Sequence, residues 1–171
     1  MNKDKDWLMS LGFTGFIPVC ELKRNMLPKA MGVYVVLRES DTLPQLLEQR
    51  TYSIQEKKYP SYPLKELYER WVKGAHIVYI GKAGCFGQKA TLQSRIGSFL
   101  GFGRGKKASH GGGRSIWQLV DCDSLMFCWK VLTDIAPCKV EHDMLADFME
   151  QYGKRPFANL NNGQKDRGLY S

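Results

Sequence analysis

The segment "IVYIGKAG", residues 77–84, decides the fold. Apolar residues lead into Tyr79 and Gly81, and Lys82 follows beside two small residues. A short run rich in β-branched and aromatic residues that ends at a glycine predicts a buried strand closed by a turn. The strand either ends there as ordinary core with Lys82 in solvent, or it presents a phenol and an ammonium to a ligand.

The same patterns predict the elements around this strand. In "MGVYVVLRES", residues 31–40, the alternation predicts a strand with Val33, Val35 and Leu37 on one face. The remaining predicted elements are a strand at 124–132 and helices at 43–50, 63–73, 91–100 and 139–153. Gly153 is expected to cap the last helix. The result is an α+β domain spanning 1–171, with an N-terminal extension (1–30), an insertion (39–75) and a tail (162–171).

Composition favours a soluble nucleic-acid-binding protein over a membrane or secreted one. The chain has 171 residues and a net charge of +8, from 25 Lys and Arg against 17 Asp and Glu. A positive excess favours polyanions such as DNA, because phosphate neutralisation releases counterions. With no apolar run of about 20 residues and no secretory leader, we expect a cytoplasmic protein. Five cysteines without a CxxC pair predict reduced thiols.

Two charged residues occupy helical positions next to the core. Glu141 is in line with Met144, Leu145 and Phe148 on one helical stripe, so its carboxylate should need a cation, a metal or several donors. Its alternative role is a first-turn glutamate that the helix dipole favours. Arg95 lies beside the stripe of the helix 91–100, where it either grips a phosphate or only reaches solvent from the edge of the core.

A glycine-rich basic segment follows that helix. "GFGRGKKASHGGGRS", residues 101–115, is not a dinucleotide-binding motif, because it follows a helix rather than a strand. We predict a mobile flap over a polyanion, with a merely solvated loop as the alternative. Its basic residues are Arg104, Lys106, Lys107, His110 and Arg114.

Cys122, Cys128, Cys138 and His142 are the residues that could form a zinc site. Their spacing matches no compact Cys/His pattern and several lie among apolar residues. Buried thiols are the better interpretation.

The order of these motifs resembles the GIY-YIG endonuclease family, and its embellished, restriction-enzyme-like branch in particular. The similarity covers residues 31–161 and rests on five elements in order. They are "GVY" at 32–34, "YIG" at 79–81, "LQSRI" with Arg95, "VEHDML" with Glu141 and "KRPFANLN" with Asn159. The two tyrosines are 45 positions apart (79 minus 34), farther than in compact members, and the insertion 39–75 accounts for the difference.

The resemblance implies a three-stranded antiparallel sheet flanked by helices and an enzyme that cuts DNA with one divalent metal, Mg²⁺ or Mn²⁺. Its implied catalytic residues are Tyr34, Tyr79, Lys82, Arg95, His110, Glu141 and Asn159, with Glu141 as the metal ligand. The loop residues Arg104, Lys106, Lys107 and Arg114 would contact DNA.

From the residue types we expect Lys82 to lower the pKa of a nearby phenol, and we favour Tyr34 as the general base. Asn159 should support the site through amide hydrogen bonds. A homodimer would serve if both strands are cut. The alternative function is a module that keeps the fold and binds nucleic acid without cutting it.

Overall fold

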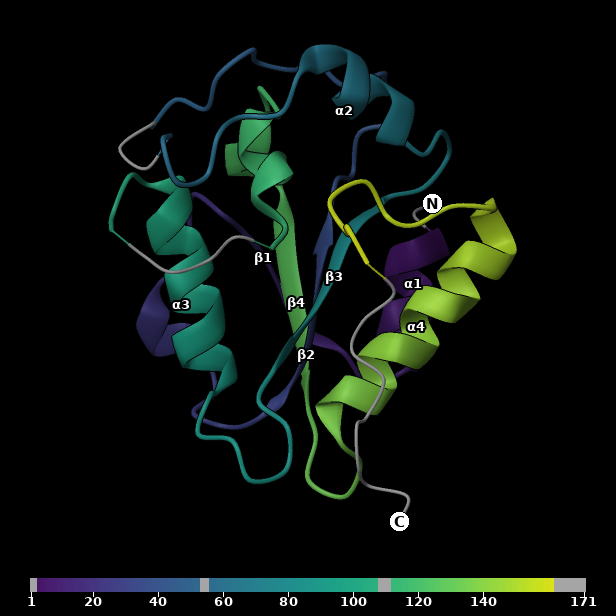
Figure 1. Cartoon of the computed structure of the whole chain (residues 1–171). Helices are drawn as coiled ribbons and strands as arrows, with labels where there is room; N and C mark the ends of the chain where they lie inside the picture. The colour runs from purple at the N-terminus through teal and green to yellow at the C-terminus, as the bar shows by residue number, and fades with distance from the viewer. Residues whose placement is uncertain (1–2, 53–55, 108–111, 162–171) are drawn as a thin grey trace.

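The computed structural model describes residues 3–52, 56–107 and 112–161. These residues form four α-helices and one four-stranded antiparallel sheet with the strand order β1-β4-β2-β3 (Figure 1). The strands are β1 (Thr14–Pro18), β2 (Gly32–Leu37), β3 (Ile77–Ala83) and β4 (Met126–Val131). His110 and the tail 162–171 lie outside the described residues. The α+β class and the antiparallel pairing of β2 with β3 agree with the sequence prediction.

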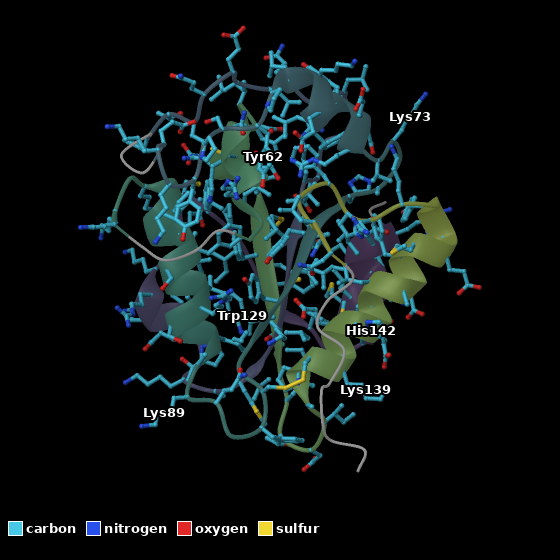
Figure 2. The ribbon with its side chains drawn as sticks, in the orientation of Figure 1. Tyr62, Lys73, Lys89, Trp129, Lys139 and His142 are labelled. Atoms are coloured by element: carbon cyan, nitrogen blue, oxygen red, sulfur yellow. A yellow bond between two sulfur atoms is a disulfide. The ribbon has the colours of Figure 1, made fainter. Side chains whose placement is uncertain are left out.

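Strand β2 lies inside the sheet and is buried along its whole length. Its apolar residues can all be buried because a helical layer covers each face of the sheet (Figure 1). Val33, Val35 and Leu37 pack with α4 (Pro137–Tyr152) and with Leu8 of α1 (Lys3–Ser10). The alternate residues of β2 face α3 (Leu92–Gly103) on the other side. Figure 2 shows side chains filling this second layer around Trp129.

The sheet has one strand more than the three that the family resemblance implied. Residues of the expected N-terminal extension form β1, which pairs with β4 at the sheet edge. The register shifts between Gly15 and Ile17, and Gly15 has a φ of 95°. A Cβ at Gly15 would lie 2.7 Å from the indole ring of Trp129, so only glycine lets this ring pack there. This contact is between distant residues, and the local pattern did not predict it.

The described part of the insertion contains one short helix rather than two. The helix α2 (Leu64–Arg70) lies within the predicted range 63–73, but residues 43–50 are not helical. Instead, the Leu47 amide donates to the carbonyl of Gln118, and the Val120 amide donates to that of Gln45. Tertiary backbone pairing with residues 118–120 therefore replaces the local hydrogen bonds of the expected helix.

The two longest helices begin and end at recognisable signals. Helix α3 starts with a capping box between Thr91 and Ser94. It continues to Gly103, three residues into the segment that we expected to be a loop, because the Trp117 ring packs directly against Gly103. Helix α4 has a proline in its first turn and ends at Gly153, whose φ of 74° confirms the predicted cap.

One disulfide corrects the expectation of reduced thiols. Cys85, just after β3, is bonded to Cys138 at the start of α4, across 53 residues of chain. The bond is visible near Lys139 in Figure 2. It removes Cys138 from the zinc ligand set that was weighed, while Cys122 and Cys128 are free thiols. Helices within the described ranges lack the combination of length and apolar composition that crossing a membrane requires.

Candidate active site

A cavity of about 360 Å³ opens at the edge strand β3. Its lining brings together Tyr79, Lys82, Arg95 and Glu141, four of the residues that the sequence singled out, and adds Gly112. These side chains come from β3, α3 and α4, which are separated in sequence and adjacent in space. The cavity therefore gathers a phenol, two cations and a carboxylate in one opening.

The position of β3 explains how groups from both faces of the sheet reach this opening. Side chains alternate along a strand, so Tyr79 faces the α3 layer while Lys82 faces the α4 layer with Ile80. Since no strand among the described residues pairs with the outer side of β3, both layers open onto its edge. Helix α4, which carries Glu141, and helix α3, which carries Arg95, lie on opposite sides of the sheet (Figure 1).

The rings of the two tyrosines form a tilted pair beside the cavity. Their ring centres are 5.9 Å apart, and Tyr34 is fully buried while Tyr79 keeps 8% of its surface exposed. Burial raises the pKa of Tyr34 well above its ordinary value. Burial also raises the pKa of Tyr79 to about 12, with a further increase from the charge of Glu141. Tyr79 therefore lines the cavity, and Tyr34 supports it from within the core.

A hydrogen bond joins the two phenols. It raises the pKa of Tyr34 and lowers that of Tyr79, as expected where the Tyr34 hydroxyl donates to the Tyr79 oxygen. Of the two, Tyr79 has the more stabilised phenolate. Tyr79 is the phenol that the cavity reaches, because the oxygen of Tyr34 is enclosed behind it. The role of Tyr34 as a general base stays a prediction.

Gly81 is required by this pair of rings. In the sheet register Gly81 lies opposite Tyr34. A Cβ at Gly81 would be 2.6 Å from Cζ of Tyr34 and 2.8 Å from Cε1 of Tyr79, well inside contact distance. The glycine of the "YIG" triplet therefore leaves space for both phenols.

Glu141 is buried as its place on the apolar stripe predicted, with 9% of its surface exposed. Burial raises the pKa of its carboxyl to about 7, and the neighbouring Lys82, Arg95 and His142 act in the opposite direction. A carboxyl whose pKa is about 7 is roughly half ionised at neutral pH. It gains from a bound cation, which would favour the ionised form.

The two cations of the cavity are not neutralised by neighbouring carboxylates. Within the described residues, neither Lys82 nor Arg95 forms a salt bridge. We expected Lys82 to lower the pKa of a phenol, but its charge acts on Glu141 and is not among the influences on either tyrosine. The reason is strand alternation, which turns Lys82 away from the phenol layer. Arg95 lowers the pKa of both tyrosines as well as that of Glu141.

The cavity suits a hydrated divalent ion. Among the described residues, no three His, Cys, Asp or Glu side chains gather into a metal-ligand cluster. Mg²⁺ commonly keeps several waters and takes one or two carboxylates together with phosphate oxygens. A single buried carboxylate beside an open, cationic cavity fits that manner of binding and does not fit a closed structural site.

Asn159 lies next to this site rather than in the cavity. Its side-chain oxygen accepts from the Ile80 amide at 3.0 Å, and its side-chain nitrogen donates to the Ile80 carbonyl at 2.8 Å. These two hydrogen bonds give partners to the backbone amide and carbonyl of Ile80, on the outer edge of β3 between Tyr79 and Gly81. Asn159 thereby fixes the strand that carries the candidate phenol.

The expected DNA contacts after α3 lie apart from the cavity. Arg104 donates to the carbonyls of Val19 and Leu22 at 2.9 and 3.3 Å, so its guanidinium ties α3 to the N-terminal segment. The guanidinium of Arg114 packs 4.4 Å from the ring centre of Tyr62. Lys106 and Lys107 are exposed just beyond α3, and their contact with DNA stays a prediction.

Two contributors to the site were missed at the sequence level. A Cβ at Gly112 would be 3.3 Å from the Tyr79 hydroxyl, so the backbone there borders the phenol closely. The run of glycines before Arg114 was the signal for such an approach. His142 is the neighbour of Glu141 in sequence, and it lowers the pKa of the Glu141 carboxyl. From the sequence it was a candidate zinc ligand only.

Comparison with known protein families, with curated proteins and with solved structures found no match to this chain.

Proposed function

We propose that this protein is a metal-dependent endonuclease that hydrolyses phosphodiester bonds in DNA. The observation that carries the proposal is the cavity at the edge of β3. It combines a buried carboxylate with two cations that form no salt bridge to any described residue, and with a phenol backed by a second phenol. The net charge of +8 supports a polyanionic substrate.

The cations of the cavity match what a phosphodiester needs. Arg95 presents a planar group that can hold a non-bridging phosphate oxygen through two parallel hydrogen bonds. Lys82 adds a second positive charge, next to the carboxylate of Glu141. Both groups favour the transition state over the substrate, because negative charge grows on the phosphate during attack.

Glu141 is the residue that would hold the metal ion. A bound Mg²⁺ or Mn²⁺ would supply Lewis-acid stabilisation of the charge on the phosphate and on the leaving oxygen. Ionised Glu141 is the form that binds such an ion, so Lys82 and Arg95 assist by lowering the pKa of its carboxyl.

Tyr79 is the proposed general base, as the phenolate. It takes a proton from a water molecule while the water oxygen bonds to phosphorus and the bond from phosphorus to the leaving O3′ breaks. The leaving oxygen then takes a proton from solvent, which yields a 3′ hydroxyl and a 5′ phosphate, and Tyr79 returns its proton to solvent. The pKa of about 12 makes the phenolate rare at neutral pH, so its stabilisation by the Tyr34 hydroxyl and by Arg95 is important.

A plasmid assay tests the proposal. Supercoiled DNA is incubated with the protein and Mg²⁺ or Mn²⁺, beside the variants Glu141→Gln and Tyr79→Phe. We expect nicked or linear product from the wild type alone. The Gln and Phe side chains keep the size of the originals, so both variants should remain folded and retain DNA affinity.

A different outcome would support the alternative function. If the wild type retards DNA of many sequences and structures but leaves it uncut with either metal, the protein is a binding module with this fold. Product that forms equally with Glu141→Gln would instead contradict the role of this carboxylate.

A further inference from the structure

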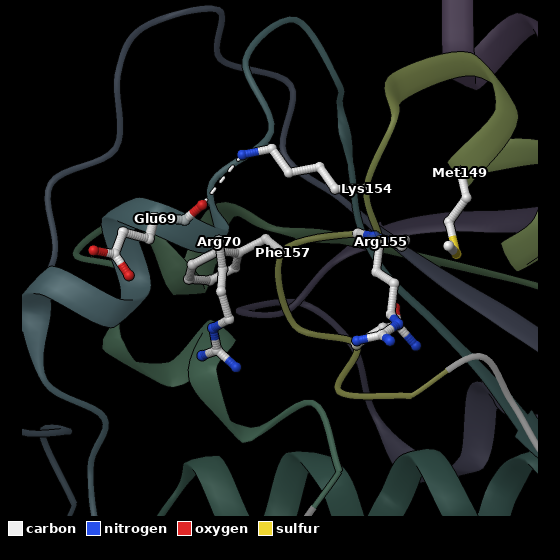
Figure 3. Close-up of a pocket in the computed structure, with 8 residues that line it drawn as sticks. Glu69, Arg70, Met149, Lys154, Arg155 and Phe157 are labelled. Carbon is white, nitrogen blue, oxygen red and sulfur yellow. Dashed lines mark hydrogen bonds between the residues drawn. The ribbon is translucent and has the colours of Figure 1, made fainter.

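A second basic cavity, of about 330 Å³, lies next to the candidate active site. Its lining includes Arg70 of α2, Lys154 and Arg155 just after α4, and Asn159 (Figure 3). Asn159 borders this cavity, while Asn161 borders the active-site cavity. Two residues of extended chain span at most about 7 Å, so one short segment separates the two openings.

Arg70 carries unused hydrogen-bond donors in this cavity. All three of its guanidinium nitrogens are buried and have no hydrogen-bond partner among the described residues. The carboxylate of Glu66 is 3.9 Å away, beyond hydrogen-bond distance, and the guanidinium packs 4.3 Å from the ring centre of Tyr62. Buried polar groups in native proteins almost always have a partner, so this guanidinium favours an anionic ligand.

The other residues of the cavity add positive charge at its mouth. Figure 3 shows the side chains of Arg70 and Arg155 extending in the same direction, whereas the carboxylate of Glu69 points away. Arg155 is exposed and donates to the carbonyl of Leu160 at 3.0 Å. Lys154 donates to the carbonyls of Glu69 and Trp71, which fixes α2 against the segment after α4.

We propose that this cavity is a second phosphate-binding subsite, in which Arg155 and Arg70 hold a backbone phosphate of the DNA strand being cut. The inference rests on the proposed function. Phosphates along one strand follow each other at about 3.4 Å of helix axis. The two cavities are bordered by residues only two positions apart, Asn159 and Asn161, so we expect the second phosphate within about three nucleotides of the scissile one. The insertion, which supplies α2, thus extends the DNA contact beyond the active site.

A double-perturbation cycle, in which a DNA phosphate and a protein side chain are changed separately and together, tests this subsite. The DNA is a short duplex whose cleavage position has been mapped, with single phosphates near that position replaced one at a time by uncharged methylphosphonates. Binding is measured in the Glu141→Gln background, which prevents cutting, with and without Arg155→Gln. Lys23→Gln, which removes one charge from an exposed residue next to η1 (Arg24–Met26), is the matched control.

We expect one methylphosphonate within about three nucleotides of the cut to weaken binding about tenfold with Arg155 present. The same replacement should have no further effect with Arg155→Gln and its full effect with Lys23→Gln. Arg155→Gln should also lower the slope of log affinity against log salt concentration by about one. Arg70→Gln, if it melts at the same temperature as the wild type, should likewise remove the effect of the methylphosphonate on binding.

Equal losses with Arg155→Gln and Lys23→Gln, in a protein that cleaves DNA, would overturn the subsite alone. A wild type that neither cleaves nor binds DNA would overturn the proposed function as well. If inorganic phosphate raises the melting temperature through Arg155 while the DNA coupling is zero, the cavity binds free phosphate and the DNA assignment falls.

Discussion

The buried carboxylate of Glu141 predicts an unusual dependence of stability on pH. Its pKa is about 7 in the folded protein against an ordinary value of 4.5, and the cause is burial. A carboxyl whose pKa is raised on folding stabilises the protein fully below its unfolded value and loses that contribution as pH rises through the folded value. The difference between 4.5 and about 7 corresponds to about 3 kcal/mol of unfolding free energy.

Glu141→Gln isolates this contribution, because the amide resembles the protonated acid in size and does not ionise. Relative to wild type without metal, the variant should gain about 3 kcal/mol between pH 4.5 and pH 8. The measurement is urea unfolding of both proteins at pH 5, 6, 7 and 8, in a chelating buffer, followed by circular dichroism. Most of the difference should develop between pH 5 and pH 8.

Adding a divalent metal ion to the same unfolding experiment tests whether Glu141 binds metal. At pH 8, Mn²⁺ should raise the unfolding free energy of the wild type, because it binds the ionised carboxylate of the folded state, and leave Glu141→Gln unchanged. Parallel pH profiles for the two proteins would refute the burial of the carboxylate. Equal stabilisation of both by Mn²⁺ would refute its role as the metal ligand.

Three further substitutions test the arrangement around the cavity. Tyr34→Phe removes the donor to the Tyr79 oxygen, so single-turnover cleavage near pH 8 should fall by about tenfold or more while DNA affinity is kept; an unchanged rate would exclude the phenol pair. Lys82→Met should move the acidic limb of the pH–rate profile to higher pH, because Lys82 lowers the pKa of Glu141; a limb that does not move would contradict this coupling. Gly81→Ala would place a Cβ 2.6 Å from the Tyr34 ring, so thermal melts should show a loss of about 1–3 kcal/mol of unfolding free energy, together with loss of cleavage. A fully active alanine variant would disprove the close packing.

Local sequence patterns predicted the elements that carry the site. The alternation in β2 and the apolar stripe of α4 required only the spacing of neighbouring residues, and both appear in the structure. The burial of Glu141 followed from the same stripe, because a helix places residues three and four apart on one face. The cap at Gly153 depended on one residue type at a helix end.

Other predictions failed because contacts between distant segments decided them. Residues 43–50 have the composition of a helix, yet their backbone pairs with residues 118–120. The N-terminal segment contributes β1 because β4 offers a free edge to it. Cys85 and Cys138 are joined because β3 and α4 pack together. The spacing of the cysteines in the sequence does not predict this packing.

The sequence by itself determined the strands β2, β3 and β4, the helices α2, α3 and α4, and the polar residues that depart from the apolar pattern, since all of these depend on local periodicity. Only the tertiary structure decided that Tyr34 is enclosed behind Tyr79 and that Lys82 acts on Glu141 rather than on a phenol. It also brought the cavity beside Arg70 next to the candidate active site. The physical reason is that the electrostatic coupling between two side chains depends on their distance in space and on their burial. The number of residues between them in the sequence determines neither quantity.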